Sequence, residues 1–265
     1  MSRSGRFSVL IGAALLLLGT IIGPVSAAPG ELPGQFLGDA WGNRANAKAG
    51  DLSTRLGRSA YVSCPCNGTN GVVRSNNVSS VDGGDRFRSG KVVSTAMADK
   101  TADMRAVART TSRVSNIRAL DGLVTIDSMY AVANVRANQN AITVSSEGSA
   151  ITGLRIAGQA RQVDPGQRVN LPGFGYAEFY LVSRWGNGEV TRQIRVDMMR
   201  IVITRQDGLN IPVGSVITST HATVGYTRRE SSSVVSAAAW GSQAQSSSPE
   251  VENAFGRSAA VYLGC

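Results

Sequence analysis

The chain has 265 residues and a formal net charge of +9, and only three of its basic residues are lysines. Charged residues make up 17% of the chain, against roughly 25% in an average soluble domain. A mean hydropathy of −0.03 and a hydrophobic content of 42% argue against a disordered chain and against a multi-spanning membrane protein. One histidine and three cysteines exclude a histidine-rich zinc or di-iron site.

The first 27 residues have the pattern of an export signal. Arg3 and Arg6 precede an uncharged, leucine-rich run, and the chain then reads Val-Ser-Ala up to Ala27, the small-x-small form that signal peptidase recognises. A membrane span needs about 20 apolar residues, and this run is shorter. The alternative interpretation is an N-terminal membrane anchor that is not cleaved. We therefore predict a signal peptide over residues 1–27 and a secreted mature chain, with no membrane span after cleavage and a net charge of +7.

The two ends of the mature chain carry the same sequence pattern. Ala40–Cys66 aligns without a gap with Ala239–Cys265, at a constant offset of 199 residues. The identities include Ala-Trp-Gly at the start, Gly-Arg-Ser-Ala in the second half and the final cysteine. An ungapped match of this length indicates a duplication. Each copy reads as a strand, a polar connection and a second strand, so we expect the first and last strands to meet in one sheet; two separate modules are the alternative.

Export makes the odd cysteine count informative. Outside the cytosol, three cysteines imply one disulfide and a free thiol, or an intermolecular bond. Cys64 and Cys66 are too close in sequence to bridge each other easily, whereas Cys66 and Cys265 occupy equivalent positions in the two copies. We predict a disulfide between Cys66 and Cys265, with Cys64 as the second choice. The chain-entropy model values such a long loop at roughly 4–5 kcal/mol.

Between the two copies, the sequence alternates as antiparallel strands do. Small and apolar residues alternate with arginines over Ala102–Val114, which favours a strand over the helix that local propensity allows. A second alternation, over Leu123–Val135, places Val124, Ile126 and Tyr130 on one face.

A long hairpin follows, and its second strand is irregular. The turn at Gly186-Asn187-Gly188 leads into Val190–Thr204, whose apolar phase changes at Met198-Met199. This change predicts a bulge or a crossing between sheets. Turn signals every eight to fifteen residues predict one all-β domain over residues 28–265. We expect an antiparallel β-sandwich with related N- and C-terminal strand pairs.

Short motifs along the chain resemble a known family. They occur in this order: Cys64–Gly71, Leu120–Val124, Asn170–Gly175, Ile211–Gly214 and His221-Ala222. Together with the Gly-Arg-Ser-Ala segments, they resemble the choice-of-anchor P family of secreted actinobacterial proteins over nearly the whole mature chain. The resemblance implies an exported protein with no assigned catalytic residues and with a C-terminal attachment signal that differs among members. This chain ends at Cys265 without an apolar tail or a sortase-type motif, so we expect release or non-covalent retention at the surface.

Two candidate sites have simpler structural interpretations. His221 could serve a Ser/His/Asp triad, but no Gly-x-Ser-x-Gly motif accompanies it, and we expect a structural or surface histidine. Asp82-Gly83-Gly84-Asp85 could contribute oxygen ligands to a Ca²⁺ ion, but it lacks the regular acidic spacing of an EF-hand, and we expect a glycine-rich turn there. We predict no catalytic, cofactor-binding or metal-binding residue and no cofactor.

The basic residues suggest an anionic partner. Those that we expect on strands are Arg105, Arg109, Arg113, Arg192, Arg195 and Arg200. Nucleic-acid binding is not predicted, because these arginines are spread over several strands in a chain with only 6% aromatic residues. Solvated strand faces are one interpretation, and attraction to an anionic cell-envelope polymer is the other.

The function predicted from these observations is a secreted, non-enzymatic protein with a binding or structural role, extracellular or associated with the cell envelope. A secreted hydrolase or carbohydrate-active enzyme is an alternative; it would need converging Asp and Glu side chains, and no spacing in the sequence indicates them. A subunit of a surface assembly is a second alternative, in which Cys64 could link chains. The choice between a monomer and a disulfide-linked oligomer stays open.

Overall fold

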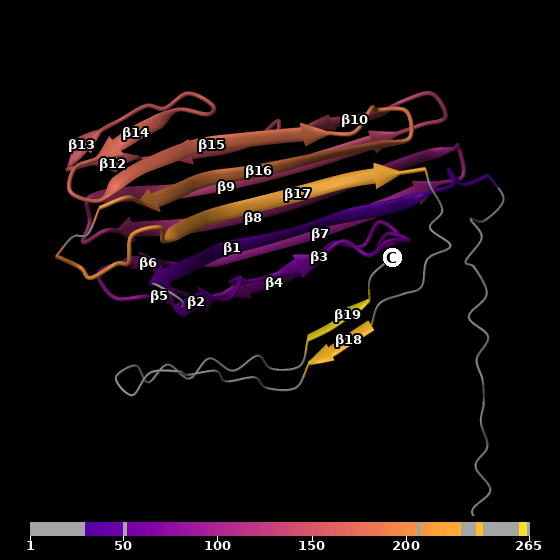
Figure 1. The fold of residues 1–265 in the computed structure, drawn as a ribbon. Helices are drawn as coiled ribbons and strands as arrows, with labels where there is room; N and C mark the ends of the chain where they lie inside the picture. The colour runs from indigo at the N-terminus through magenta and orange to yellow at the C-terminus, as the bar shows by residue number, and fades with distance from the viewer. Residues whose placement is uncertain (1–29, 50–51, 206–207, 229–236, 241–259, 264–265) are drawn as a thin grey trace, which may run out of the picture.

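The computed structural model describes residues 30–49, 52–205, 208–228, 237–240 and 260–263 (Figure 1). Within these ranges the chain forms β-strands and no helix. Two antiparallel sheets pack against each other, as Figure 1 shows. The all-β antiparallel sandwich predicted from the alternation is therefore confirmed. The predicted signal peptide, residues 1–27, lies outside the described residues.

The first sheet has seven strands in the order β14-β15-β16-β17-β1-β2, with β3 also paired to β1. Their bounds are β1 (Gln35–Ala49), β2 (Leu52–Leu56), β3 (Val62–Ser63), β14 (Arg168–Leu171), β15 (Gly175–Trp185), β16 (Thr191–Ile203) and β17 (Val216–Thr227). The predicted long hairpin is β15 and β16, whose pairing runs from Gly175 opposite Ile203 to Trp185 opposite Gln193. The centre of this sheet joins the start of the sandwich to its end, because β1 pairs with β17.

The second sheet has ten strands around the central pair β8 and β9. Their bounds are β4 (Arg74–Val78), β5 (Val81–Asp82), β6 (Phe87–Ser89), β7 (Val92–Thr101), β8 (Arg105–Ala119), β9 (Val124–Ala137), β10 (Ile142–Ser145), β11 (Ala150–Thr152), β12 (Arg155–Ile156) and β13 (Gln159–Ala160). Strands β10, β11 and β12 each pair with β9, and β7 pairs with β8 and β4.

The duplication seen in the sequence is also a duplication of strand pairing. Ala40 of β1 pairs with Val62 of β3, and Ala239 of β18 (Ala237–Trp240) pairs with Val261 of β19 (Ala260–Leu263). Both members of the second pair lie 199 residues after their counterparts, so the two copies share one register. Strands β18 and β19 nevertheless form a two-stranded sheet of their own. The expectation that the first and last strands meet in one sheet is therefore wrong. Strand β1 already has partners on both sides, because β17 pairs along one side and β2 and β3 pair along the other.

The core lies between the two sheets. The face of β8 that alternation assigns to the interior, from Ala106 to Val114, is buried along its whole length, as predicted. Only the start of this strand differs, because Met104 takes a positive φ of 59° in a turn before Arg105. Where β1 begins and β17 ends, Phe36 packs edge-on against Tyr226, with 5.1 Å between the ring centres.

A kink crosses the first sheet and explains the phase change in β16. Met198 faces Thr220 of β17, but neither belongs to the paired register, and Thr220 has a φ of +62°. Tyr180 of β15 continues the same row, with a φ of +51°. A residue in this left-handed region turns the following side chains to the opposite face. The phase change is confirmed, but β16 has no extra residue and stays in one sheet, so neither the predicted bulge nor the crossing occurs.

A similar kink in the second sheet corrects one predicted face. Asn116 of β8, with a φ of +49°, faces Asp127 of β9, and both lie outside the paired register. Val124 and Ile126 are buried before this point, but Met129 takes the interior position after it. Tyr130 therefore lies on the outer face, and its predicted placement beside Ile126 is wrong.

Candidate functional site

Two adjoining hollows lie on the outer side of the second sheet. The first has a volume of about 580 Å³ and lies over β7, β8 and β9. The second, of about 440 Å³, continues toward β10. Four residues line both: Arg109, Asn134, Arg136 and Thr143. We term the two hollows together, with Arg105 at one end, the basic groove.

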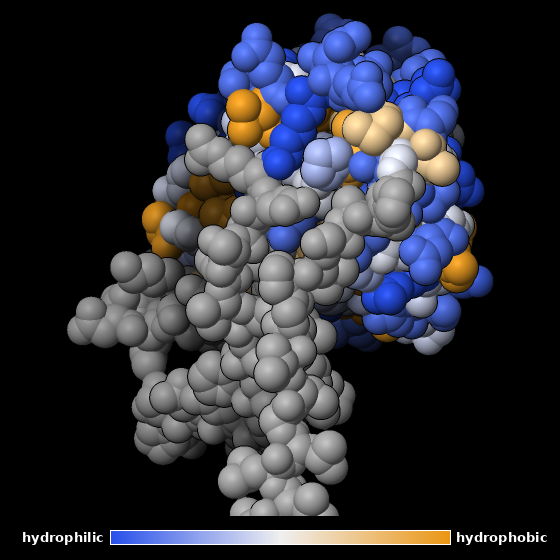
Figure 2. Space-filling view, turned by 90° about the vertical axis from the view of Figure 1, so that its right-hand side faces the viewer, coloured by the Kyte–Doolittle hydropathy of each residue, from blue (hydrophilic) through white to orange (hydrophobic). Residues whose placement is uncertain are grey.

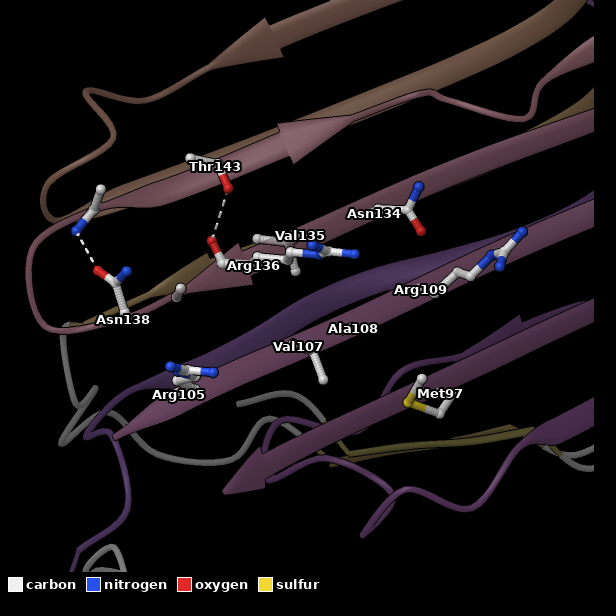
Figure 3. A pocket seen from close by; sticks show the side chains of 12 residues that line it. Met97, Arg105, Val107, Ala108, Arg109, Asn134, Val135, Arg136, Asn138 and Thr143 are labelled. Atoms are coloured by element: carbon white, nitrogen blue, oxygen red, sulfur yellow. Dashed lines mark hydrogen bonds between the residues drawn. The ribbon is translucent and has the colours of Figure 1, made fainter. Parts of the chain in front are cut away.

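The strand register brings the groove arginines together. Arg109 of β8 pairs with Asn134 of β9, and Val107 pairs with Arg136. Arg109 and Arg136 are thus diagonal neighbours, a relation that places residues about 7–8 Å apart in an antiparallel pair. Alternation turns both side chains outward, because the adjacent residues Ala108 and Val135 are buried in the core. Figure 3 shows Arg105, Arg109 and Arg136 along the same depression, with Thr143 on the next strand.

The groove carries positive charge that is only partly compensated. Arg105 forms an exposed ion pair with Asp103, at 3.1 Å. In the described part of the chain, no carboxylate lies within ion-pair distance of Arg109, Arg113 or Arg136. Unpaired guanidinium groups on one surface attract anions and can bind carboxylate or phosphate oxygens through two N–H groups at once.

Neutral polar groups contact the arginines of the groove. Arg109 donates to the hydroxyl of Tyr130 at 3.4 Å, and Arg113 lies over the Tyr130 ring at 4.8 Å from its centre. The hydroxyl of Thr143 donates to the carbonyl of Arg136 at 3.3 Å, which ties β10 to β9 across the groove (Figure 3). Glu147 is the one acidic residue among those that line the two hollows. The site can therefore hold a negatively charged, hydrogen-bonding ligand.

The six arginines that the sequence analysis placed on several strands are divided between the two sheets. Arg105, Arg109 and Arg113 lie on the groove side of β8. Arg195 and Arg200 instead lie on the first sheet, and each forms an ion pair. Arg195 binds Asp197 at 2.7 Å, and Arg200 shares Glu178 with Arg168 of the neighbouring strand β14. Arg192 lines a further hollow beside β10.

Arg136 was missed by the sequence analysis. The alternation of β9 was read in one phase throughout, and the kink at Asp127 reverses that phase before Arg136 is reached. The signal that could have found it is the alternation of Met129, Ala131, Ala133 and Val135, which are all buried and leave Arg136 on the opposite face.

His221 lies on the other sheet, in a buried charge cluster. Its Nδ1 lies 2.5 Å from Oδ1 of Asp197, and its Nε2 lies 3.2 Å from Oδ1 of Asp39. Trp41 stacks on the imidazole ring with 4.4 Å between centres and an angle of 11°. Each carboxylate also binds an arginine, and Arg58 approaches Asp39 at 2.8 Å. The cluster ties β1, β16 and β17 together.

The two carboxylates favour the charged form of the histidine. Burial alone would lower the pKa of His221, but the hydrogen bonds of Asp197 and Asp39 outweigh it, and the pKa is raised above its ordinary value of 6.5. Burial likewise opposes the charge on Asp197, yet His221 and Arg195 hold the pKa of this carboxyl below its usual 3.8. The two carboxylates therefore favour the imidazolium form of His221 over the neutral ring.

This arrangement does not form a Ser/His/Asp triad. Both ring nitrogens of His221 face carboxylates, so neither is left to accept a proton from a nucleophile. The nearby Ser219 donates its hydroxyl proton to Oδ1 of Asn43, at 2.6 Å. The geometry fits a structural histidine.

The acidic turn before β6 is tied to an arginine. Asp82 accepts from the N–H of Gly84 at 2.8 Å and from Nε of Arg88 at 3.1 Å. Asp85 binds the same guanidinium at 3.4 Å. Within the described ranges, no group of three or more His, Cys, Asp or Glu side chains is placed to hold a metal ion.

The two described cysteines differ in state. Cys64 is a free thiol and is 7% exposed. Burial raises the pKa of this thiol to about 12, an effect that the positive charge of Arg74 only partly offsets. Cys66 is not a free thiol. Its predicted partner, Cys265, lies outside the described residues, so the pairing stays a prediction.

A search of the described segments for a helix long and apolar enough to cross a membrane found none. No family model, curated protein or solved structure matches the chain.

Proposed function

We propose that this protein is a secreted, non-enzymatic protein that binds an anionic polymer of the cell envelope through the basic groove. The observation that carries the proposal is the pair Arg109 and Arg136, which lie side by side on the outer face of the second sheet without a carboxylate partner among the described residues. Arginines without a carboxylate partner in a preformed depression can make charge-assisted hydrogen bonds to an anionic ligand, whereas arginines on an open surface stay hydrogen-bonded to water.

An envelope polymer fits this groove better than a nucleic acid. Single-stranded nucleic acids bind on exposed aromatic side chains that stack with the bases. The ring of Tyr130, whose hydroxyl accepts a hydrogen bond from Arg109, already lies under the guanidinium of Arg113. The export signal that we propose over residues 1–27 would also bring the chain into contact with the envelope.

We also propose that the chain belongs to the choice-of-anchor P family and that Cys66 forms a disulfide with Cys265. The motif order supports membership of the choice-of-anchor P family, whose members are exported. The buried free thiol of Cys64 leaves Cys66 as the cysteine available for the bridge to Cys265. In an oxidising compartment this bridge would link the two copies of the repeat.

Retention on isolated actinobacterial cell walls tests the proposed function. We expect the protein to sediment with the walls at low salt and to be released as salt rises, because exposed charge interactions are screened. The double variant Arg109→Gln, Arg136→Gln should lower the affinity about tenfold or more, since it removes two charge-assisted contacts.

The matched control is the double variant Arg155→Gln, Arg161→Gln. It removes the same charge from two exposed positions outside the groove, and it should retain near wild-type binding. Equal losses in both double variants would show that only net charge matters and would overturn the groove assignment. No retention of the wild-type protein at low salt would overturn the function itself.

A further inference from the structure

A third hollow continues the basic groove past the edge strand β10. It has a volume of about 480 Å³ and lies between β10 and the turn that joins β15 to β16. Thr143 lines this hollow and both hollows of the groove. The N–H of Ile142 donates to the carbonyl of Gly188 at 2.7 Å, so the turn is fixed against β10. The three hollows therefore form one continuous path from the second sheet to the first.

The far end of this path carries its own positive charge. Arg184 of β15 pairs in register with Ile194, whose side chain is fully buried, and paired residues share a face. Arg184 therefore points to the inner side of the first sheet at its open end, and Arg192, two residues before Ile194, lies on the same face. Among the described residues, neither arginine has a carboxylate within ion-pair distance. Figure 2 shows this end of the sandwich, whose upper part is mainly hydrophilic.

The balance of charge along the path is positive. Its arginines are Arg105, Arg109, Arg136, Arg184 and Arg192. Glu147 and Glu189 are the two acidic residues that line it. Arg192 keeps one guanidinium N–H on the carbonyl of Gly186, at 2.8 Å.

The length of the path defines the ligand. Neighbouring strands lie about 4.8 Å apart, so the path crosses about 10 Å from β8 to β10 before it reaches the third hollow. A single phosphate or sulfate ion can contact one end only. We infer that the site binds a linear polyanion, which lies across β8, β9 and β10 and is held at its second end by Arg184 and Arg192. This inference rests on the proposed function and adds a second anchoring point and a minimum ligand length.

The lining also indicates what kind of polyanion fits. None of the residues that line the three hollows, all in the described part of the chain, is aromatic. The path thus offers contacts to charged groups and to a polar backbone but no surface on which bases can stack. A polymer with regularly spaced phosphate or carboxylate groups and no bases matches this chemistry.

Calorimetric titration with probes of different length tests the inference. The probes are long-chain inorganic polyphosphate, pyrophosphate, polygalacturonate and single-stranded DNA, each added to the full-length protein at low salt. We expect long polyphosphate or polygalacturonate to bind far more tightly than pyrophosphate, because linked contacts raise the effective concentration of the second anchor. The tighter of the two polymers identifies the charged group as phosphate or carboxylate.

The double variant Arg184→Gln, Arg192→Gln should weaken the long polymer roughly tenfold to a hundredfold and leave pyrophosphate unchanged. Arg184→Gln alone is the second variant, since Arg184 lacks the hydrogen bond that Arg192 makes to the turn, and Arg184→Lys should restore part of the affinity.

The outcomes separate the two proposals. If Arg109→Gln, Arg136→Gln weakens polymer binding but the variants at Arg184 do not, the second anchor is wrong and the proposed function stands. Single-stranded DNA that binds more tightly than both other polymers would overturn the inference. If no polyanion and no cell wall binds the wild-type protein, both proposals fail.

Discussion

Oδ1 of Asp197 lies 2.5 Å from Nδ1 of His221, directly across the strand pair β16–β17. The second carboxylate, Asp39, reaches the same ring from β1, and Arg195 and Arg58 bind the outer oxygens of the two acids. Three central strands of the first sheet are thus joined by one compensated charge cluster. Its members depend on each other, because a buried charge is stable only while its partner is present.

Asp197→Asn should destabilise the protein by about 3 kcal/mol, since it leaves a buried imidazolium with one carboxylate fewer. Asp39→Asn should cost less, about 1 kcal/mol, because the side chain of Asp39 is 20% exposed and water can replace part of the contact. Urea unfolding of both variants measures the difference. Equal and small effects would show that the cluster does not stabilise the sheet.

The same cluster predicts how stability depends on pH. The raised pKa of His221 gives a contribution that is complete below 6.5 and is lost as pH rises through the folded-state pKa. The lowered pKa of Asp197 gives a contribution that is complete above 3.8 and is lost as pH falls through its folded-state pKa. We therefore expect the contribution of the cluster to be greatest between these values. The difference in unfolding free energy between wild type and His221→Gln, followed against pH, should decline above pH 6.5; a flat difference would contradict the charged histidine.

Cys64 should resist thiol reagents in the native protein. Its thiol is buried, and its raised pKa of about 12 leaves almost no thiolate at pH 8. Iodoacetamide should label it only after unfolding, as peptide mass mapping can show. The same map, made without reductant, tests the Cys66–Cys265 bridge: an alkylated Cys265 would exclude it.

Gly42 is a position where any side chain should be costly. A Cβ at this position would lie 2.2 Å from Cγ1 of Val92, on the opposite sheet. Gly42→Ala should therefore destabilise the sandwich by about 1–3 kcal/mol through overpacking. Val92→Ala should relieve part of this cost when the two are combined, so a double-mutant cycle in urea should give a favourable coupling. Purely additive effects would argue against a direct contact between β1 and β7.

Strand periodicity predicted much of the fold but not its kinks. The alternation of β8 identified its buried face from Ala106 to Val114, because one residue in two must face the core. The same rule failed in β9 because one phase was carried through the whole strand, whereas the left-handed residue Asn116 on the neighbouring strand marks a reversal opposite Asp127. Arg136 was lost from the site for this reason. Likewise, the two carboxylates around His221 come from strands far apart in sequence, so only the sheet order brings them together.

The position of β1 has a consequence for how the chain acquires its structure. Gln35 pairs with Thr227, so the centre of the first sheet joins residues 192 positions apart. Pairings this distant form slowly, because the chain must close a long loop before any contact compensates the lost entropy. A growing chain cannot complete this sheet until residue 227 is free to return to β1. The topology itself therefore delays completion of the first sheet until the chain has been made as far as Thr227, and until then β1 lacks the strand that pairs along most of its length.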